Sequence, residues 1–216
     1  MSASKAGRTK PSRPSRERGA ATATIDGRTA RAHRTRAAIV EALLQLLQEG
    51  RFHPTAQEVA DRADVALRSI RQHFASRDAL FLAVADRITA TTLGSSTAID
   101  PAAPLRARLS AFALARTTYL EATAVVRRAA LAQEASSPAI AKAFRFLART
   151  RHRELERTFA RELDALGDQR AHALAALAVV SGGRVWDGLR GEQGLSREEA
   201  SAVLRRLIAG SLRRAA

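Results

Sequence analysis

Three polar side chains at helical spacing, Arg68, Arg71 and Gln72, are the residues of this chain best suited to recognise another molecule. A guanidinium group can donate two parallel hydrogen bonds to the O6 and N7 atoms of guanine, and a glutamine amide can pair with an adenine edge. Leu67, one helical turn before Arg71, could contact the methyl group of a thymine. These four side chains are therefore candidates for reading the edges of DNA bases.

A short helix is predicted just before these residues. Thr55 and Glu58 form a capping box, in which each side chain bonds the backbone amide of the other, so the helix should begin directly after Thr55. Val59, Ala60 and Ala63 form a narrow apolar stripe along it, which indicates that this side packs against the rest of the domain.

The helix that carries the arginines is predicted at about residues 66–74, after a break at Asp64 and Val65. Ile70 and Phe74 are four residues apart and should face inward. Two short helices joined by a tight turn are the layout of a helix-turn-helix, whose second helix enters the major groove of DNA. From spacing alone, an ordinary pair of helices with a solvated charged face is an equal alternative.

Residues that match a known pattern extend over four consecutive predicted helices. They are Thr35, Ile39, Ala42, Leu43 and Gly50, then Thr55, Val59, Ala60, Ala63 and Val65, then Ile70, His73 and Phe74, and finally residues 74–80, Phe-Ala-Ser-Arg-Asp-Ala-Leu. In residue type and spacing, this segment resembles the DNA-binding domain of the tetracycline-repressor (TetR) family of bacterial transcriptional regulators. The resemblance implies that the DNA contacts are made by Thr35, Thr55, Leu67, Arg68, Ser69, Arg71, Gln72, His73 and Arg77. Of these, Thr35, Thr55, Ser69, His73 and Arg77 would position the DNA backbone.

The segment departs from the family at four positions. Asp64 stands where the family usually has Gly, Ala66 where it has a capping Ser or Thr, Ser69 where it has Thr, and Arg71 where it has Tyr. Loss of the hydroxyl at Ala66 should weaken the start of the recognition helix by about 1 kcal/mol unless Asp64 caps it instead. These changes affect which operator is read more than how DNA is bound.

The formal net charge of +15 is unevenly distributed. Residues 1–34 hold nine basic and two acidic residues, residues 35–93 hold seven of each, and the remainder holds 20 basic and 12 acidic. The predicted helix-turn-helix domain, residues 34–82, is therefore not basic as a whole. Its positive charge is placed locally, on the helix that would read DNA.

Residues 1–33 are predicted to be a disordered basic arm, since Met1 and Ile25 are their only large apolar side chains. Such an arm could add phosphate contacts or enter the minor groove of DNA. A solvated tail with no part in binding is the equal alternative.

Residues 83–216 are predicted to form a larger helical domain. Helices are expected to open at Asp100-Pro101 and Ser137-Pro138, after Asp168, and at the capping box of Ser196 and Glu199. The helix after Ser137 should end near Gly167, and the next should run to about Gly188. In the helix after Ser137, the residues expected to face inward are Ile140, Phe144, Leu147, Leu155 and Phe159. No strand-like alternation occurs, so the predicted fold is all-α, with a three-helix helix-turn-helix domain followed by an effector-binding and dimerisation domain.

The TetR family pairs its last two helices across a two-fold axis, which implies a homodimer. The implied interface residues are Ala175, Val179, Gly182, Trp186, Val203, Leu204, Leu207 and Ile208. The family also places a ligand pocket among its middle helices. The implied pocket residues are Phe112, Tyr119, Arg127, Phe144, Arg149, His152 and Trp186. Each of these pocket residues is equally suited to plain core or solvated surface.

Other classes of protein find little support. Cysteine is absent, and there is no nucleophile motif, phosphate-binding loop or zinc-spaced cluster. His152 and Glu156 share a helix face, which an ordinary surface ion pair explains. No catalytic residue, metal or cofactor is therefore expected, although an all-helical enzyme remains an alternative. A non-specific basic DNA-binding protein would explain the charge but not the helix-turn-helix.

The resemblance implies a homodimeric transcriptional regulator, a repressor that an unknown small-molecule effector releases from a palindromic operator in double-stranded DNA. No run approaches the roughly 18 apolar residues that a membrane span needs, and no signal peptide is evident. A cytoplasmic protein without a membrane partner is expected.

Overall fold

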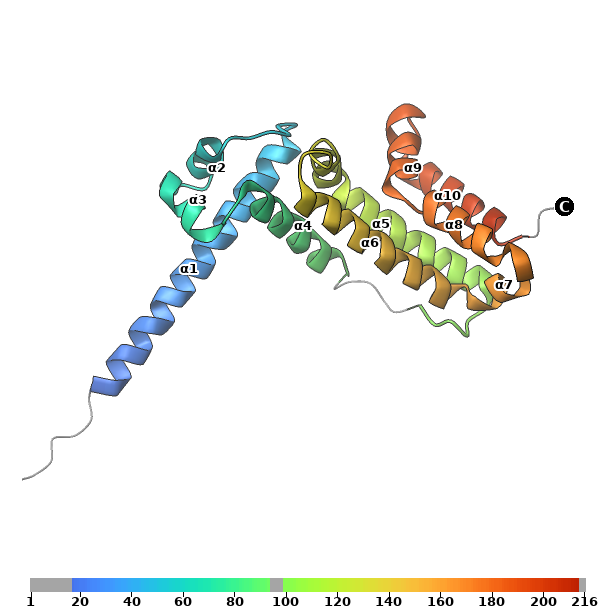
Figure 1. The fold of residues 1–216 in the computed structure, drawn as a ribbon, viewed down its shortest axis with the longest axis horizontal. Coiled ribbons are helices and arrows are strands. Elements are labelled where there is room, and N and C mark those ends of the chain that lie inside the picture. Colours follow the sequence, from blue (N-terminus) through green and yellow to red (C-terminus); the bar gives the residue numbers. More distant parts are fainter. Residues whose placement is uncertain (1–16, 94–98, 214–216) are drawn as a thin grey trace, which may run out of the picture. The chain divides into compact units, whose positions relative to one another are not determined.

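The computed structural model describes residues 17–93 and 99–213, which are built from helices and contain no strand (Figure 1). The all-α fold predicted from the sequence is confirmed. The first helices are α1 (Glu17–Gln48), α2 (Ala56–Arg62), α3 (Leu67–His73) and α4 (Arg77–Leu93). They are followed by α5 (Leu105–Leu131), α6 (Pro138–Thr158), α7 (Ala160–Ala165), the 3-10 turn η1 (Gly167–Gln169), α8 (Arg170–Val180), α9 (Gly183–Asp187), the π-helical turn η2 (Gly188–Glu192) and α10 (Arg197–Ser211).

By its internal contacts the chain divides into two compact units, residues 1–38 and 39–216. Helix α1 begins at Glu17, so residues 17–33 are helical where a disordered arm was expected. No proline interrupts this stretch, and alanine, the strongest helix former, recurs along it. The part of the expected arm that precedes Glu17 lies outside the described residues.

Helices α1 to α4 build one core, to which the end of α5 also contributes. Leu47, Val59 and Ile70 are each at most 7% exposed, and Val126 of α5 packs with them. Helix α4 continues past residue 82 and packs along α5. The domain boundary expected at that residue therefore lies inside a helix, and the two predicted domains share apolar contacts.

Helix α5 begins later than predicted. Its first residue is Leu105, whereas Pro101 was expected to open it. Pro104 accounts for the difference, because a proline disfavours helical conformation in the residue before it. Asp100 instead closes a turn, in which its carboxylate accepts a hydrogen bond from the N–H of Ala102 at 2.8 Å.

Helix α6 begins as predicted. The Ser137 hydroxyl accepts a hydrogen bond from the N–H of Ile140 at 3.1 Å, and Pro138 occupies the first helical position. Most of its predicted inward face is buried or half-buried. Leu147 is the exception at 36% exposed, so that part of the prediction was wrong. The spacing of apolar residues shows which side chains share one face of α6, but not how much of that face the neighbouring helices cover.

The helix also ends earlier than predicted. Phe159 has φ −120° and ψ 25°, which breaks α6 and starts the short α7 before Gly167. Asp168 lies within η1 and does not cap α8, which Gln169 precedes without a side-chain cap. Helix α8 then stops at Val180, well short of its predicted end near Gly188. The extended backbone of Gly182, with φ −79° and ψ 159°, separates it from α9.

The last helix was predicted correctly. The N–H of Glu199 donates to the Ser196 hydroxyl at 3.2 Å, and the Ser196 N–H donates to the Glu199 carboxylate at 2.8 Å. Helices α5 to α10 enclose a second apolar core. Its most buried members, each at most 1% exposed, include Phe112, Leu120, Leu155, Leu177 and Leu204.

Candidate nucleic-acid interface

The capping box at Thr55 holds the first helix of the helix-turn-helix. The N–H of Glu58 donates to the Thr55 hydroxyl at 3.2 Å, and the Thr55 N–H donates to the Glu58 carboxylate at 2.6 Å. The hydrogen bonds from Thr55 lower the pKa of Glu58, which also pairs with Arg51. The Thr55 hydroxyl donates to the same carboxylate at 2.9 Å, so the side chain expected at the DNA backbone is already engaged in the cap.

The turn between α2 and α3 depends on Asp64. Its φ of 52° lies in the left-handed region, which aspartate tolerates better than most residues because its short polar side chain can bond locally. The N–H of Val65 donates back to the carbonyl of Ala60 at 3.0 Å. Ala66 is the N-cap residue of α3, and no side chain makes a capping hydrogen bond there. The expectation that Asp64 could cap this helix instead was therefore wrong.

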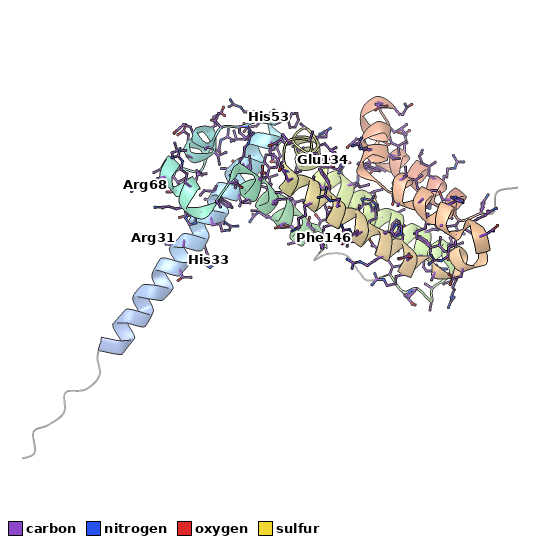
Figure 2. The ribbon with its side chains drawn as sticks, in the orientation of Figure 1. Arg31, His33, His53, Arg68, Glu134 and Phe146 are labelled. Carbon is purple, nitrogen blue, oxygen red and sulfur yellow. The ribbon has the colours of Figure 1, made fainter. Side chains whose placement is uncertain are left out.

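The recognition helix α3 exposes the three polar side chains singled out by the sequence. Arg68, Arg71 and Gln72 are exposed, and Figure 2 shows Arg68 on the outside of α3. Ile70 and the following Phe74 are buried beneath them, as predicted. The apolar underside thus anchors a helix whose opposite face carries two cations.

Four of the expected contact residues are only partly accessible. Leu67 is half-buried and packs against the domain core instead of pointing outward, because it begins the helix next to the turn. Ser69 and His73 are half-buried as well, and Arg77 is exposed at the start of α4. Thr35 is half-buried on α1, within the unit formed by residues 1–38.

Ion pairing separates the supporting arginines from those left for a ligand. Arg62 forms a two-pronged pair with Glu49 at 2.6 and 2.9 Å, which joins the end of α2 to the end of α1. In the described part of the chain, Arg68, Arg71 and Arg77 form no ion pair with a carboxylate. Their charge is therefore available to DNA phosphates or guanine edges.

The residues expected to line an effector pocket do not act as one group. Phe112 and Trp186 are about 1% exposed and belong to the second core, while Arg149 and His152 are exposed. Phe144 and Tyr119 are half-buried. The sequence could not separate these environments, because all of these positions lie on helices with mixed faces.

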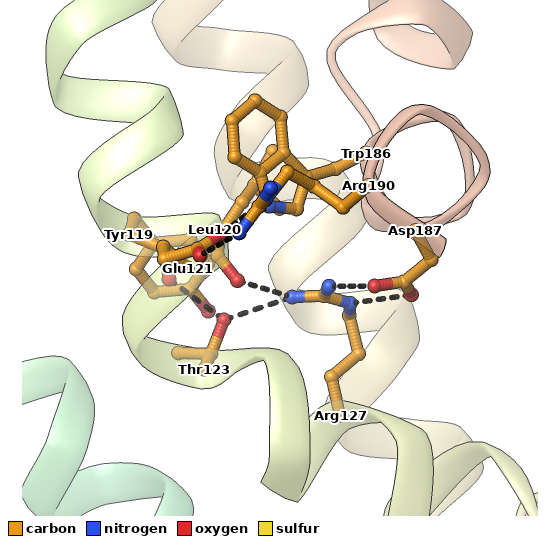
Figure 3. Close-up of polar contacts among 8 residues, drawn as sticks. All are labelled: Tyr119, Leu120, Glu121, Thr123, Arg127, Trp186, Asp187 and Arg190. Atoms are coloured by element: carbon orange, nitrogen blue, oxygen red, sulfur yellow. Dashed lines mark hydrogen bonds and ion pairs between the residues drawn. The ribbon is translucent and has the colours of Figure 1, made fainter. Parts of the chain in front are cut away.

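Arg127 is held in a structural network between α5 and α9 (Figure 3). Its guanidinium donates to Asp187 at 2.6 and 3.3 Å, to the Leu120 carbonyl at 3.0 Å and to the Thr123 hydroxyl at 3.0 Å. A Cβ at Gly183 would lie 2.4 Å from the Arg127 Nε atom. Glycine at this position therefore makes room for the Arg127 side chain within the chain.

Trp186 is fixed in the same network. Its indole N–H donates to Glu121 at 2.9 Å, and Arg190 pairs with the same carboxylate at 3.0 Å (Figure 3). Burial is the largest single influence on the pKa of Glu121 and raises it. The hydrogen bonds and charge of its partners act in the opposite direction and together lower the pKa below its ordinary value. Neither Arg127 nor Trp186 is left unpartnered for a ligand.

Sequence reasoning missed two other arginines, Arg116 on α5 and Arg151 on α6. The Nε of Arg116 donates to the Ser181 carbonyl at 2.6 Å, and its guanidinium lies 5.1 Å from the centre of the Tyr119 ring. The Nε of Arg151 is buried without a partner. Their helical spacing gave no signal, because arginine is frequent on every helix of this chain.

The predicted dimer residues also divide into two groups. Ala175 is exposed, Val179 is 67% exposed and Leu207 is 38% exposed, so α8 and α10 present an uncovered apolar face. Leu204 and Ile208 are fully buried within the chain, as is Trp186. Val203 and Gly182 are half-buried.

The described residues contain neither a candidate metal site nor a candidate membrane span. No group of three or more histidines or acidic residues there could hold a metal ion. None of the helices in residues 17–93 and 99–213 combines the length and the apolar character of a membrane span.

Residues 39–84 match the family described as bacterial regulatory proteins, tetR family. No curated protein is similar enough in sequence to count as a relative. Among solved structures, the fold is similar to that of a transcriptional regulator from Rhodococcus sp. Rha1, with a TM-score of 0.64 and 20% identity, covering 84% of this chain and 95% of that one. It is also similar to a protein of Pseudomonas aeruginosa PAO1 described as a transcriptional regulator, with a TM-score of 0.61 and 19% identity, covering 82% of this chain and 89% of that one.

Proposed function

Because residues 39–84 carry the helix-turn-helix of the tetR family of bacterial regulatory proteins, we propose that this protein is a homodimeric transcriptional repressor. It binds a palindromic operator and is released from it by a small-molecule effector. The observation that carries the proposal is the outer face of α3, where Arg68 and Arg71 are exposed above a buried apolar underside and form no ion pair with the carboxylates of the described residues. A protein that acts on DNA in this way works in the cytoplasm.

The uncovered apolar face of α8 and α10 supports the homodimer. An isolated protomer would leave Val179 and Leu207 in water, whereas a second copy would cover them. A two-fold dimer also provides two recognition helices, which must lie about 34–36 Å apart to reach successive major grooves. Ala175, one turn before Val179, keeps the approach of the two α8 helices close.

A hydrogen bond between α4 and α6 supports regulation by an effector. The Ser137 hydroxyl donates to the Asp78 carboxylate at 2.6 Å, so the first turn of α6 is tied to the first turn of α4. Asp78 directly follows Arg77, at the edge of the recognition surface. A ligand that shifts α6 along its axis would therefore move α4 and change the spacing of the two recognition helices.

The test is selection of binding sites from a random DNA pool with the purified full-length protein. We expect enrichment of a palindrome whose half-sites are centred about 10 base pairs, or a multiple of one turn, apart. The Arg68→Ala variant serves as a matched comparison, because it keeps the fold and loses one base contact. If no palindrome is enriched by the unaltered protein, the proposal fails.

A further inference from the structure

Two half-buried arginines of the C-terminal helices form no ion pair with an acidic residue in the described part of the chain. Among the described residues, Arg116 donates one hydrogen bond, to the carbonyl of Ser181 at the end of α8, although a guanidinium can donate five. Arg151 has a buried Nε without any partner. In the described residues neither side chain forms an ion pair. Each carries its charge into the protein incompletely compensated.

The helix geometry places these two arginines opposite each other. Helices α5 and α6 form an antiparallel hairpin, seen side by side in Figure 1, and Arg108 of α5 donates to the Thr158 carbonyl of α6 at 2.6 Å. From that contact, Arg116 lies eight residues along α5 and Arg151 seven residues back along α6. At a rise of about 1.5 Å per residue these steps are roughly 12 and 10 Å, so the two arginines reach the same level of the hairpin.

The electrostatics agree with this placement. The pKa of Arg116 is lowered to about 10, with burial as the largest cause and the positive charge of Arg151 as the next. Burial also lowers the pKa of Arg151. Tyr119 and Glu154 act on both groups in the opposite direction, which places these two residues close to both arginines. Two mutually repelling cations thus share one site with the only tyrosine of the chain.

The same domain supplies acidic partners for its other internal arginines. Arg108 is 2% exposed and bonds both oxygens of Glu162 at 2.6 and 2.8 Å. Arg127 is paired in the same way with Asp187. A buried cation without a counter-charge is expensive, and proteins normally pair it. Arg116 and Arg151 are the exception among the described residues, because Glu154 acts on both of them without forming an ion pair with either. Both guanidinium groups can therefore still take a direct anionic partner from outside the chain.

We propose that Arg116 and Arg151 together bind the carboxylate or phosphate group of an organic anion, and that this anion is the effector. The identification of the anion as the effector rests on the regulatory function proposed above. Phe112 and Leu120, four residues before and after Arg116 on α5, are buried in the second apolar core, so the side of α5 that carries Arg116 is otherwise apolar at these positions. The hydrogen bond to Ser181 fixes one edge of Arg116 and leaves the other edge for two parallel bonds to the anion.

Binding is tested on the full-length protein by thermal unfolding and calorimetry. The probes are benzoate, octanoate and inorganic phosphate, with the uncharged benzamide and octanamide as controls, all at one ionic strength. Unfolding is followed through Trp186, which is the only tryptophan of the chain and is buried. We expect at least one anion, at about 100 times its Kd, to raise the Tm by roughly 5–10 °C, and the amides to leave it unchanged.

The variants are Arg116→Gln, Arg151→Gln and, as a matched control, Arg145→Gln, which removes an exposed charge from the same helix α6. We expect each of the first two to weaken anion binding at least tenfold and the control to bind normally. If Arg116→Gln does not fold, Arg151→Gln and Arg116→Lys decide the question. No anion effect in the unaltered protein, or an effect that persists in both glutamine variants, would overturn the proposal.

A separate measurement distinguishes this inference from the proposed function. The anion that binds is added to the protein bound to its selected operator, and the apparent affinity for DNA should fall at least fivefold. An anion that binds but leaves operator affinity unchanged refutes its role as effector while the binding site stands. Failure to enrich any operator would instead overturn the regulatory function, with the anion-binding result unaffected.

Discussion

Replacement of Arg116 by methionine should make the protein more stable in the absence of ligand. Burial lowers the pKa of Arg116 to about 10, well below its ordinary value. Since a pKa difference of one corresponds to about 1.4 kcal/mol, retaining the charge in the folded protein costs up to about 3 kcal/mol. Methionine has a similar length and no charge, so the substitution removes that cost.

Two favourable contacts are lost in the same substitution. The hydrogen bond from Arg116 to the Ser181 carbonyl, at 2.6 Å, contributes about 1 kcal/mol. The guanidinium over the Tyr119 ring, at 5.1 Å, contributes about 0.5–1 kcal/mol. The free energy of unfolding of Arg116→Met should therefore exceed that of the unaltered protein by about 1–1.5 kcal/mol at pH 7.

Urea denaturation followed by Trp186 fluorescence measures this difference, with Arg145→Met as the exposed control. The pH dependence of this difference tests whether the charge of Arg116 is its cause. A base whose pKa is lowered by folding destabilises the protein below that pKa, and the cost is relieved as the pH rises above it. The advantage of the variant should thus be full at pH 7 and narrow above pH 10. Destabilisation by 2 kcal/mol or more would refute the reasoning and make Arg116 a structural residue.

Three further predictions concern single contacts. Arg68→Ala should weaken operator binding by about 1–3 kcal/mol and relax specificity in a competition assay, whereas equal loss on operator and random DNA would restrict Arg68 to phosphate contact. Ala66→Ser should raise the free energy of urea unfolding by about 1 kcal/mol, because α3 has no side-chain cap, and an unchanged value would show that the missing cap costs nothing. Glu162→Gln should lower it by about 3–5 kcal/mol at pH 7, because Arg108 is left buried without its counter-charge. Arg108 lowers the pKa of Glu162, so the contribution is present above the ordinary pKa near 4.5 and is lost as the pH falls through the folded value; a difference between the two proteins that persists at pH 2 would contradict this account.

The helix starts that depend on neighbouring residues were predictable from the sequence. The caps at Thr55, Ser137 and Ser196 form as expected. Each is made by groups at most three residues apart, so no distant part of the chain is needed to form it. The turn at Asp64 was also located correctly, although its left-handed backbone and the missing cap at Ala66 became evident only in the structure.

Predictions of where the long helices of the C-terminal part begin and end were less successful. The start of α5, the end of α6 and the end of α8 all differ from the sequence pattern. Local proline geometry accounts for the first. The breaks at Phe159 and Gly182 follow no residue signal strong enough to read in advance, because packing against other helices decides where a helix may bend.

The sequence alone indicated a helix-turn-helix through its resemblance to the TetR family, because the caps, the apolar spacing and the arginines that carry this resemblance lie within about 45 consecutive residues. It did not distinguish Arg116 and Arg151 from the 34 other basic residues of the chain. Only the tertiary structure partly buries both of them and pairs Arg108 and Arg127 with acidic residues, while these two form no ion pair in the described part of the chain. The charge of a side chain is a property of the residue, but its cost depends on burial and on partners from distant helices, which no local pattern encodes.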